Sequence, residues 1–215
     1  ADVEYCNNPA KDSGIAHTQR DVPFPASQQA RHAFRAMPGG TDIEKRNKAL
    51  FAFFMLTGAR DGAVASLKLK HVNLADGHVL QDGRDVNTKN SKTIDTWFYP
   101  VDAAYLECFE AWVRYLQDEK LFGREDALFP KPELKPVNGR YQSVGLSREN
   151  YANASKLIRV IREAFAMVQQ PEFTPHSFRK TLGLYANQVC KTPEEFKAWS
   201  LNLGHEHMAT TFNAY

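Results

Sequence analysis

Long apolar runs are missing from this sequence. The longest one, residues 49–56, covers about two helical turns, whereas a helix that crosses a bilayer needs about 20 apolar residues. No signal peptide precedes it. We therefore expect a cytoplasmic protein with no membrane partner.

Cysteine is scarce. The three cysteines, Cys6, Cys108 and Cys190, are far apart and odd in number. This excludes a disulfide framework and the paired spacing of a structural zinc site, and it fits a reducing compartment.

An excess of charge of either sign is also missing. The sequence has 27 Lys and Arg against 25 Asp and Glu, a net charge of +2. A charge this small does not by itself indicate nucleic-acid binding, so any basic footprint would have to be local.

What remains is the composition of a globular domain, with 43% hydrophobic and 24% charged residues in a chain of 215. Residues 1–24 show no hydrophobic period, and we expect a linker or tail there. Residues 25–215 are enough for one domain with a sizeable core. The chain begins with alanine, which we interpret as the mark of a fragment of a longer protein.

Helical periodicity dominates after residue 25. Thr41 and Glu44 have the spacing of a capping box, and Gly58 ends the helix that follows. The Pro- and Gly-rich stretch 121–148 is expected to be a long surface loop. We predict helices at 27–37, 42–57, 61–69, 102–117, 149–168, 175–190 and 193–203, then a last helix, and strands at 71–74, 78–80, 84–88 and 94–101. The predicted fold is α+β and mainly α, with one small three-stranded antiparallel sheet.

Two motifs place a cation at a junction of these elements. Arg60 follows Gly58, directly before a new helix. Lys89 and Lys92 flank Asn90-Ser91 at the tip of a predicted hairpin. Each has a simpler interpretation when taken alone: a surface ion pair for the arginine and a solvated turn for the lysines.

Two further motifs lie in the C-terminal helices. His176 and Arg179 share a face of a first helical turn, where backbone N–H groups also favour an anion. His205 follows Gly204 at a helix junction, and Tyr215 is the last residue. A capping histidine and an ordinary tyrosine are the simpler interpretations.

The triplet His205-Glu206-His207 suggests a metal, but its spacing does not support one. Adjacent helical residues point about 100° apart, and the i, i+4 pair of a zinc-protease helix is absent. We expect no metal and no cofactor.

The four motifs in this order resemble the catalytic domain of the tyrosine recombinases, the phage integrase family. The resemblance covers residues 25–215 and rests on the segments TGAR, NTKNSK, HSFR, LGH and ATTFNAY. It implies the mainly helical fold of that domain, without the N-terminal core-binding domain of full-length relatives.

The resemblance also implies a mechanism of site-specific DNA recombination and integration. Tyr215 would attack a DNA phosphodiester and form a 3′-phosphotyrosine, with no ATP or metal. Arg60 and Arg179 would clamp the phosphate oxygens. His176 and His205 would donate hydrogen bonds or accept the tyrosine proton, and Lys89 would protonate the leaving oxygen. Lys92 is the alternative acid.

Two features depart from the family pattern. Ala63 stands where relatives usually have an acidic residue. His205 and Tyr215 are ten residues apart, one more than in many relatives.

The expected partner is double-stranded DNA at attachment sites. Between residues 131 and 162, seven basic residues outnumber two acidic ones. We expect DNA contacts from Arg148, Lys156, Arg159 and Arg162, and from Lys92. The resemblance also implies a homotetramer on synapsed sites, DNA-bending accessory proteins and a bacterial nucleoid location.

Two alternatives stay open. A type IB-like topoisomerase shares the active-site chemistry but only relaxes DNA. A catalytically silent DNA-binding paralogue would use the same fold as a regulator. The complete set of six side chains argues against the silent form, whereas Ala63 and the tyrosine spacing leave it open.

Overall fold

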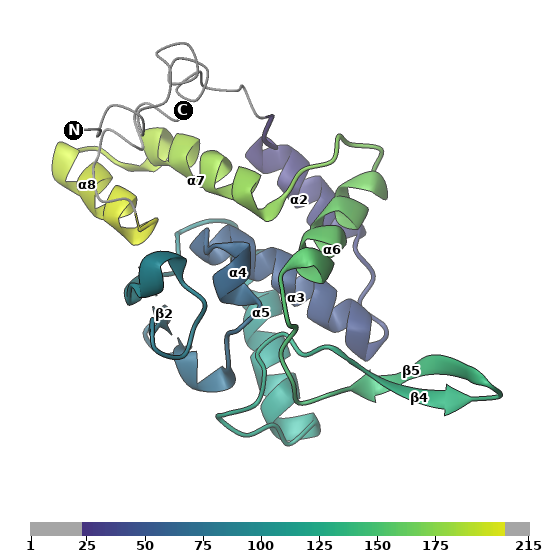
Figure 1. Cartoon of the computed structure of the whole chain (residues 1–215). Coiled ribbons are helices and arrows are strands. Elements are labelled where there is room, and N and C mark those ends of the chain that lie inside the picture. The colour runs from purple at the N-terminus through teal and green to yellow at the C-terminus, as the bar shows by residue number, and fades with distance from the viewer. Residues whose placement is uncertain (1–22, 205–215) are drawn as a thin grey trace, which may run out of the picture.

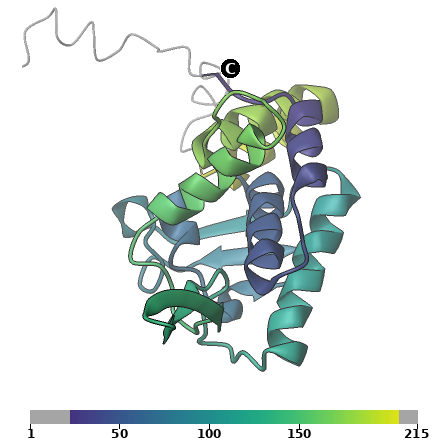
Figure 2. The ribbon, with the colours of Figure 1, turned by 90° about the vertical axis from the view of Figure 1, so that its right-hand side faces the viewer.

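Helix α3 (Asp42–Thr57) lies at the centre of the fold in the computed structural model, which describes residues 23–204. Every residue from Ala49 to Thr57 is buried, as expected for a helix enclosed on all sides. Four helices pack against it, as Figures 1 and 2 show: α2 (Ser27–Ala36), α5 (Ala103–Arg114), α6 (Ser155–Ala166) and α7 (Pro175–Val189).

The predicted ends of α3 are confirmed. Thr41 Oγ1 accepts the Glu44 N–H at 3.3 Å, and Glu44 Oε2 accepts the Thr41 N–H at 2.8 Å. Gly58 ends the helix in the left-handed conformation, with φ of 57°. The position of Arg60, two residues later, is therefore fixed by a helix stop.

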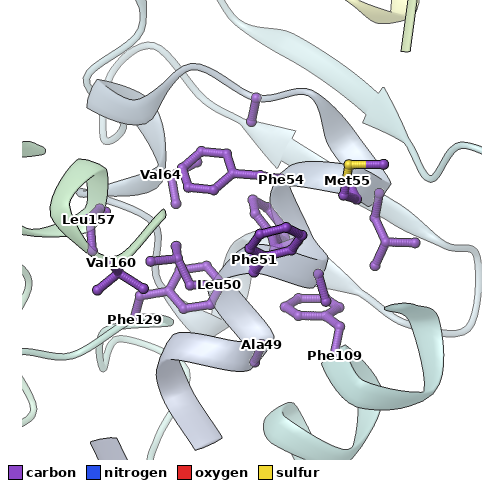
Figure 3. Packing of buried hydrophobic residues seen from close by; sticks show 14 of the residues in the cluster. Ala49, Leu50, Phe51, Phe54, Met55, Val64, Phe109, Phe129, Leu157 and Val160 are labelled. Carbon is purple, nitrogen blue, oxygen red and sulfur yellow. The ribbon is translucent and has the colours of Figure 1, made fainter. Parts of the chain in front are cut away.

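Aromatic rings fill the core. Phe51 of α3 packs edge-on against Phe178 of α7 at 4.9 Å between centroids, and Phe53 lies 5.0 Å from Phe109 of α5. Figure 3 shows Leu157 and Val160 of α6 beside the same cluster. This packing holds α7, with its HSFR motif, against α3.

The predicted three-stranded antiparallel sheet is also confirmed. It has the order β1 (Val72–Asn73), β2 (His78–Gln81) and β3 (Ile94–Trp97). Val79 pairs with Val72 on one side and with Thr96 on the other. Helix α8 (Pro193–Asn202) lies beside β3.

The predicted strand at 84–88 is wrong. The N–H groups of Asp85 and Val86 both donate to the carbonyl oxygen of Asp82, which makes this segment a turn. The Asp82 carboxylate also accepts the N–H of Arg84. Local bonds to an aspartate compete with strand pairing here.

The prediction of a surface loop over 121–148 is wrong as well. The segment contains an antiparallel hairpin of β4 (Pro132–Val137) and β5 (Arg140–Leu146), which projects from the body in Figure 1. Asn138 and Gly139 both have positive φ, as a tight two-residue turn requires. Pro132 and Pro136 conceal the strand pattern, but β4 has a free edge that tolerates them.

Two predicted helices are shorter than expected. The helix at 61–69 is only α4 (Asp61–Val64), followed by the 3-10 turn η2 (Leu69–His71). The helix at 149–168 starts at Ser155. Helix α5 continues into the π-helical turn η4 (Tyr115–Glu119). The last predicted helix lies outside the described residues.

Candidate active site

Arg60 and Arg179 line one small cavity. Arg60 comes from the start of α4 and Arg179 from the first turns of α7. The cavity of about 10 Å³ leaves room for roughly one water molecule. Two arginines separated by more than a hundred residues of sequence therefore meet at one point of the fold.

Arg179 is buried, with 5% of its surface exposed. Its Nη1 donates to the carbonyl oxygen of Gly58 at 2.5 Å, and its Nη2 donates to that of Leu203 at 2.5 Å. The guanidinium thus joins the end of α3 to the end of α8. Such charge-assisted bonds fix the orientation of the group.

Gly58 makes this junction possible. A Cβ at this position would lie 2.8 Å from Leu203 Cδ2 and 3.0 Å from Leu182 Cδ1. Any side chain would therefore displace the Leu203 and Leu182 side chains that pack between these helices. The glycine serves both the left-handed backbone and the close approach.

The chain passes Arg60 again at Gly204, the last described residue. A Cβ at Gly204 would lie 3.8 Å from Arg60 Nη1 and 3.5 Å from Ile94 Cδ1. The predicted site residues His205 and Tyr215 lie outside the described residues.

His176 lies in the field of the same cations. Its pKa is lowered by partial burial and by the positive charges of Arg179, Lys180 and Arg60, while Asp61 opposes the shift. More than a third of its surface stays exposed. A neutral imidazole at neutral pH can exchange a proton with a bound group.

Asp61 is a charged neighbour of the candidate site that the sequence analysis did not single out. Its charge acts on His176, and it follows Arg60 directly in the chain. Ala63, where the family resemblance leads us to expect an acidic residue, is 1% exposed and packs in the core. The acidic residue of this short segment is therefore Asp61, and position 63 has none.

The cavity also has a polar wall that the sequence did not indicate. Gln81 Nε2 donates to Thr96 Oγ1 at 2.7 Å, and both side chains are buried. They come from adjacent strands β2 and β3 and line the cavity with the two arginines. The burial of Gln81 and Thr96 depends on tertiary contacts, so no sequence signal could have found this wall.

Lys89 lies on the connection between β2 and β3, in the 3-10 turn η3 (Lys89–Ser91). Its side chain is exposed, and it forms no ion pair with any of residues 23–204. Asn90 and Ser91 have φ of 59° and 51°. The structure places Lys89 at the tip of a loop, outside the cavity. Lys92, also exposed, follows η3.

Arg148, a predicted DNA contact, is engaged within the protein. Its Nη1 donates to the Asp126 carboxylate and to the Leu121 carbonyl, and its guanidinium lies 4.8 Å from the Phe122 ring centroid. These contacts hold the turn after η4 against the segment that leads into α6.

Three of the other four predicted DNA contacts, Lys156, Arg159 and Arg162, lie on the exposed face of α6. Arg159 pairs with Glu163 at 3.2 Å and Arg162 with Glu172 at 3.7 Å, in exposed pairs. Lys156 is exposed one turn earlier. Exposed pairs are weak, so a phosphate can replace the carboxylates.

Comparison with known proteins places this arrangement in context. The family model described as "Phage integrase family" matches residues 26–215. The chain is 22% identical over 204 residues to tyrosine recombinase XerC of Pseudomonas putida (strain W619), covering 93% of this chain and 58% of that protein. The chain thus spans less than two thirds of this relative.

Solved structures share the fold. The XerA recombinase superposes with a TM-score of 0.61 at 20% identity, over 92% of this chain and 61% of that one. A lambda integrase (75-356) dimer bound to a COC′ core site superposes with a TM-score of 0.59 at 16% identity, over 93% of this chain and 63% of that one.

Among residues 23–204, no helix is both long and apolar enough to span a bilayer.

Proposed function

Because this chain belongs to the phage integrase family, we propose that it catalyses site-specific DNA recombination by cutting and rejoining strands through a tyrosine. The observation that carries the proposal is the meeting of Arg60 and Arg179 at one cavity with His176 in their field. Two guanidiniums can bind the non-bridging oxygens of one phosphate and stabilise the charge that develops there.

The proposed step is a transesterification. The Tyr215 hydroxyl attacks the scissile phosphorus, the new bond joins phosphorus to the tyrosine oxygen, and the bond to the 5′ oxygen breaks. Lys89 gives its proton to that leaving oxygen, and His176 or His205 takes the tyrosine proton. The 3′-phosphotyrosine conserves the ester bond, so rejoining is the reverse step and needs neither ATP nor a metal.

The electrostatics of the site support these roles. The lowered pKa of His176 keeps its imidazole neutral at neutral pH and able to accept a proton. Lys89 is exposed on a loop beside the sheet that forms the polar wall, where it can approach a bound strand. Arg179 is already oriented by two carbonyl groups.

Double-stranded DNA is the proposed substrate, with the exposed face of α6 and Lys92 along its backbone. In this proposal the active assembly is a homotetramer on synapsed sites, assisted by DNA-bending proteins on the bacterial nucleoid.

A nicked suicide substrate tests the function. The protein is incubated with nicked attachment-site DNA in EDTA without ATP, and covalent adducts are resolved on a denaturing gel. An adduct from the native protein that Tyr215→Phe does not form supports strand transfer. DNA binding without any adduct would support the silent paralogue, and relaxation without exchange between sites would support the topoisomerase.

A further inference from the structure

Asp85 is the centre of an ionic cluster that none of the proposed catalytic roles uses. Its Oδ2 lies 2.6 Å from Lys70 Nζ and 3.1 Å from His71 Nε2, and its Oδ1 lies 3.1 Å from Lys68 Nζ. Glu125 Oε2 also contacts both lysines, at 3.2 Å from Lys68 Nζ and 2.9 Å from Lys70 Nζ. Three donors from one segment of the chain thus converge on one carboxylate.

The segment that carries these donors is firmly held. The Leu69 N–H donates to the Asp126 carbonyl at 3.0 Å, and the Lys70 N–H donates to the Arg124 carbonyl at 2.9 Å. His71 is 4% exposed, and its Nδ1 accepts the Lys68 N–H at 2.9 Å. Its Nε2 therefore carries the proton and donates to Asp85.

Asp85 belongs to the loop between β2 and β3, four residues before Lys89. Around it, the Val86 side chain is buried and the Asn87 N–H donates to Ser66 Oγ at 2.8 Å. These contacts fix the first half of the loop to the body. Four residues span at most about 14 Å. The ionic contacts of Asp85, which we call the anchor of the loop, therefore limit where Lys89 can reach.

Gly83 joins the two halves of the same loop. A Cβ there would lie 2.0 Å from the carbonyl oxygen of Ser91, so the backbone of residue 91 rests directly against Gly83. The Gly83 N–H also donates to Thr93 Oγ1 at 3.2 Å. The η3 turn is thus held from both sides while the Lys89 side chain stays exposed.

We propose that Asp85, held by Lys68, Lys70 and His71, is a positioning residue that sets the reach of Lys89 toward the leaving oxygen of the cleaved strand. This inference rests on the proposed function. Asp85 touches no reacting atom, and its carboxylate acts only through the loop. Loss of the anchor leaves the fold of the sheet in place but widens the range of positions that the lysine samples.

The test compares two leaving groups in the suicide assay. One substrate is ordinary DNA, and the other carries sulfur in place of the 5′ bridging oxygen. A thiolate leaves without a proton because a thiol is a much stronger acid than an alcohol, so the sulfur substrate does not need Lys89. We expect Asp85→Asn to cleave the oxygen substrate at least about tenfold more slowly, and the sulfur substrate at close to the native rate.

A double-mutant cycle completes the test. In a Lys89→Ala background, Asp85→Asn should have no further effect on the oxygen substrate, because both changes act through one group. Asp85→Glu, which keeps the charge, should recover most of the native rate. Glu110→Gln is the matched control, since it breaks an ion pair with Arg114 at 3.0 Å on α5. It should leave the cleavage rates of both substrates unchanged.

The outcomes are separable. Equal slowing of both substrates by Asp85→Asn, or slowing that multiplies with that of Lys89→Ala, overturns the inference and leaves the recombinase function intact. If Asp85→Asn does not fold, Lys70→Met tests the same anchor from its other side with the same criterion. Absence of any adduct from the native protein overturns the proposed function, and the role of Asp85 with it.

Discussion

Arg179 Nη2 donates to the carbonyl oxygen of Leu203 at 2.5 Å, so the guanidinium of α7 holds the end of α8. The next residue, Gly204, is where the chain passes Arg60. An arginine expected to bind phosphate is therefore also a structural part of the site. One substitution at this position should therefore affect both the stability of the fold and the cleavage of DNA.

Arg179→Lys should damage both stability and cleavage. Lysine keeps the charge but cannot reach both carbonyl oxygens with the planar geometry of arginine. We expect a loss of about 2–4 kcal/mol in the free energy of unfolding and no detectable covalent adduct. Chemical denaturation and the suicide assay measure the two effects. Arg114→Lys, at an exposed ion pair on α5, should leave stability within about 0.5 kcal/mol.

Gly58→Ala should destabilise the protein by about 2–4 kcal/mol. The added Cβ would stand 2.8 Å from Leu203 Cδ2, and the residue has a φ of 57° that alanine adopts poorly. Gly39→Ala is the control, because a Cβ there has nothing within 4 Å. If Gly58→Ala and Gly39→Ala have the same denaturation midpoint, the close contact between α3 and α8 is contradicted.

Lys89→Ala should slow cleavage by about 10²–10⁴-fold, the usual contribution of a general acid, while DNA affinity changes little. Single-turnover cleavage and gel-shift titration separate the two quantities. If Lys92 is the acid instead, the large loss of cleavage will be found with Lys92→Ala, and Lys89→Ala will resemble the native protein.

Substitutions on the exposed face of α6 should weaken DNA binding without changing the chemistry. Replacing Lys156, Arg159 or Arg162 by alanine should reduce the slope of log affinity against log salt by about one for each phosphate that the side chain neutralises. Fluorescence anisotropy at several salt concentrations gives the slope. Arg114→Ala on α5 should leave it unchanged, and an equal effect of that variant would argue for a general charge effect.

Mild acid should destabilise the protein through its histidines. The pKa of His71 is lowered from its ordinary 6.5 by burial, against the pull of Asp85, and that of His176 is also lowered. The unfolded chain therefore binds more protons just below pH 6.5, and stability is lost as pH falls through that window. His71→Gln, which can keep both hydrogen bonds without titrating, should make the loss between about pH 7 and 5 smaller. If His71→Gln has the same pH profile of stability as the native protein, the lowered pKa of His71 is contradicted.

Residues that cap helices or form turns predicted the ends of the elements, because those ends depend on contacts between neighbours in the sequence. Thr41, Glu44 and Gly58 fix the ends of α3, and the sequence contains all three. The hairpin at Asn138-Gly139 has an equally clear turn signal, but the prolines of β4 hide it. Prolines usually exclude a strand, and only the free edge of a two-stranded ribbon explains their presence.

The site could be predicted only in part, because its geometry depends on tertiary contacts. The order of motifs predicts Arg60, His176 and Arg179 as site residues, and in the structure the two arginines line one cavity and lower the pKa of His176. Sequence spacing does not reveal that Arg179 holds Leu203, or that Gln81 and Thr96 form a wall.

The engagement of Arg148 within the fold was equally hidden. An arginine bound to Asp126 looks the same in sequence as one bound to phosphate. The carboxylate of Asp61, which acts on His176, has no spacing signal of its own either. Only the folded chain shows which charges lie near one another.

The most direct test of tyrosine strand transfer is to identify the residue joined to DNA. The adduct from the suicide substrate is digested with protease and nuclease, and the nucleotide-linked peptide is sequenced by mass spectrometry. We predict a single 3′-phosphate linkage, located on Tyr215. A linkage on any other residue, or a free 3′ end with no linked peptide, would contradict the proposed mechanism.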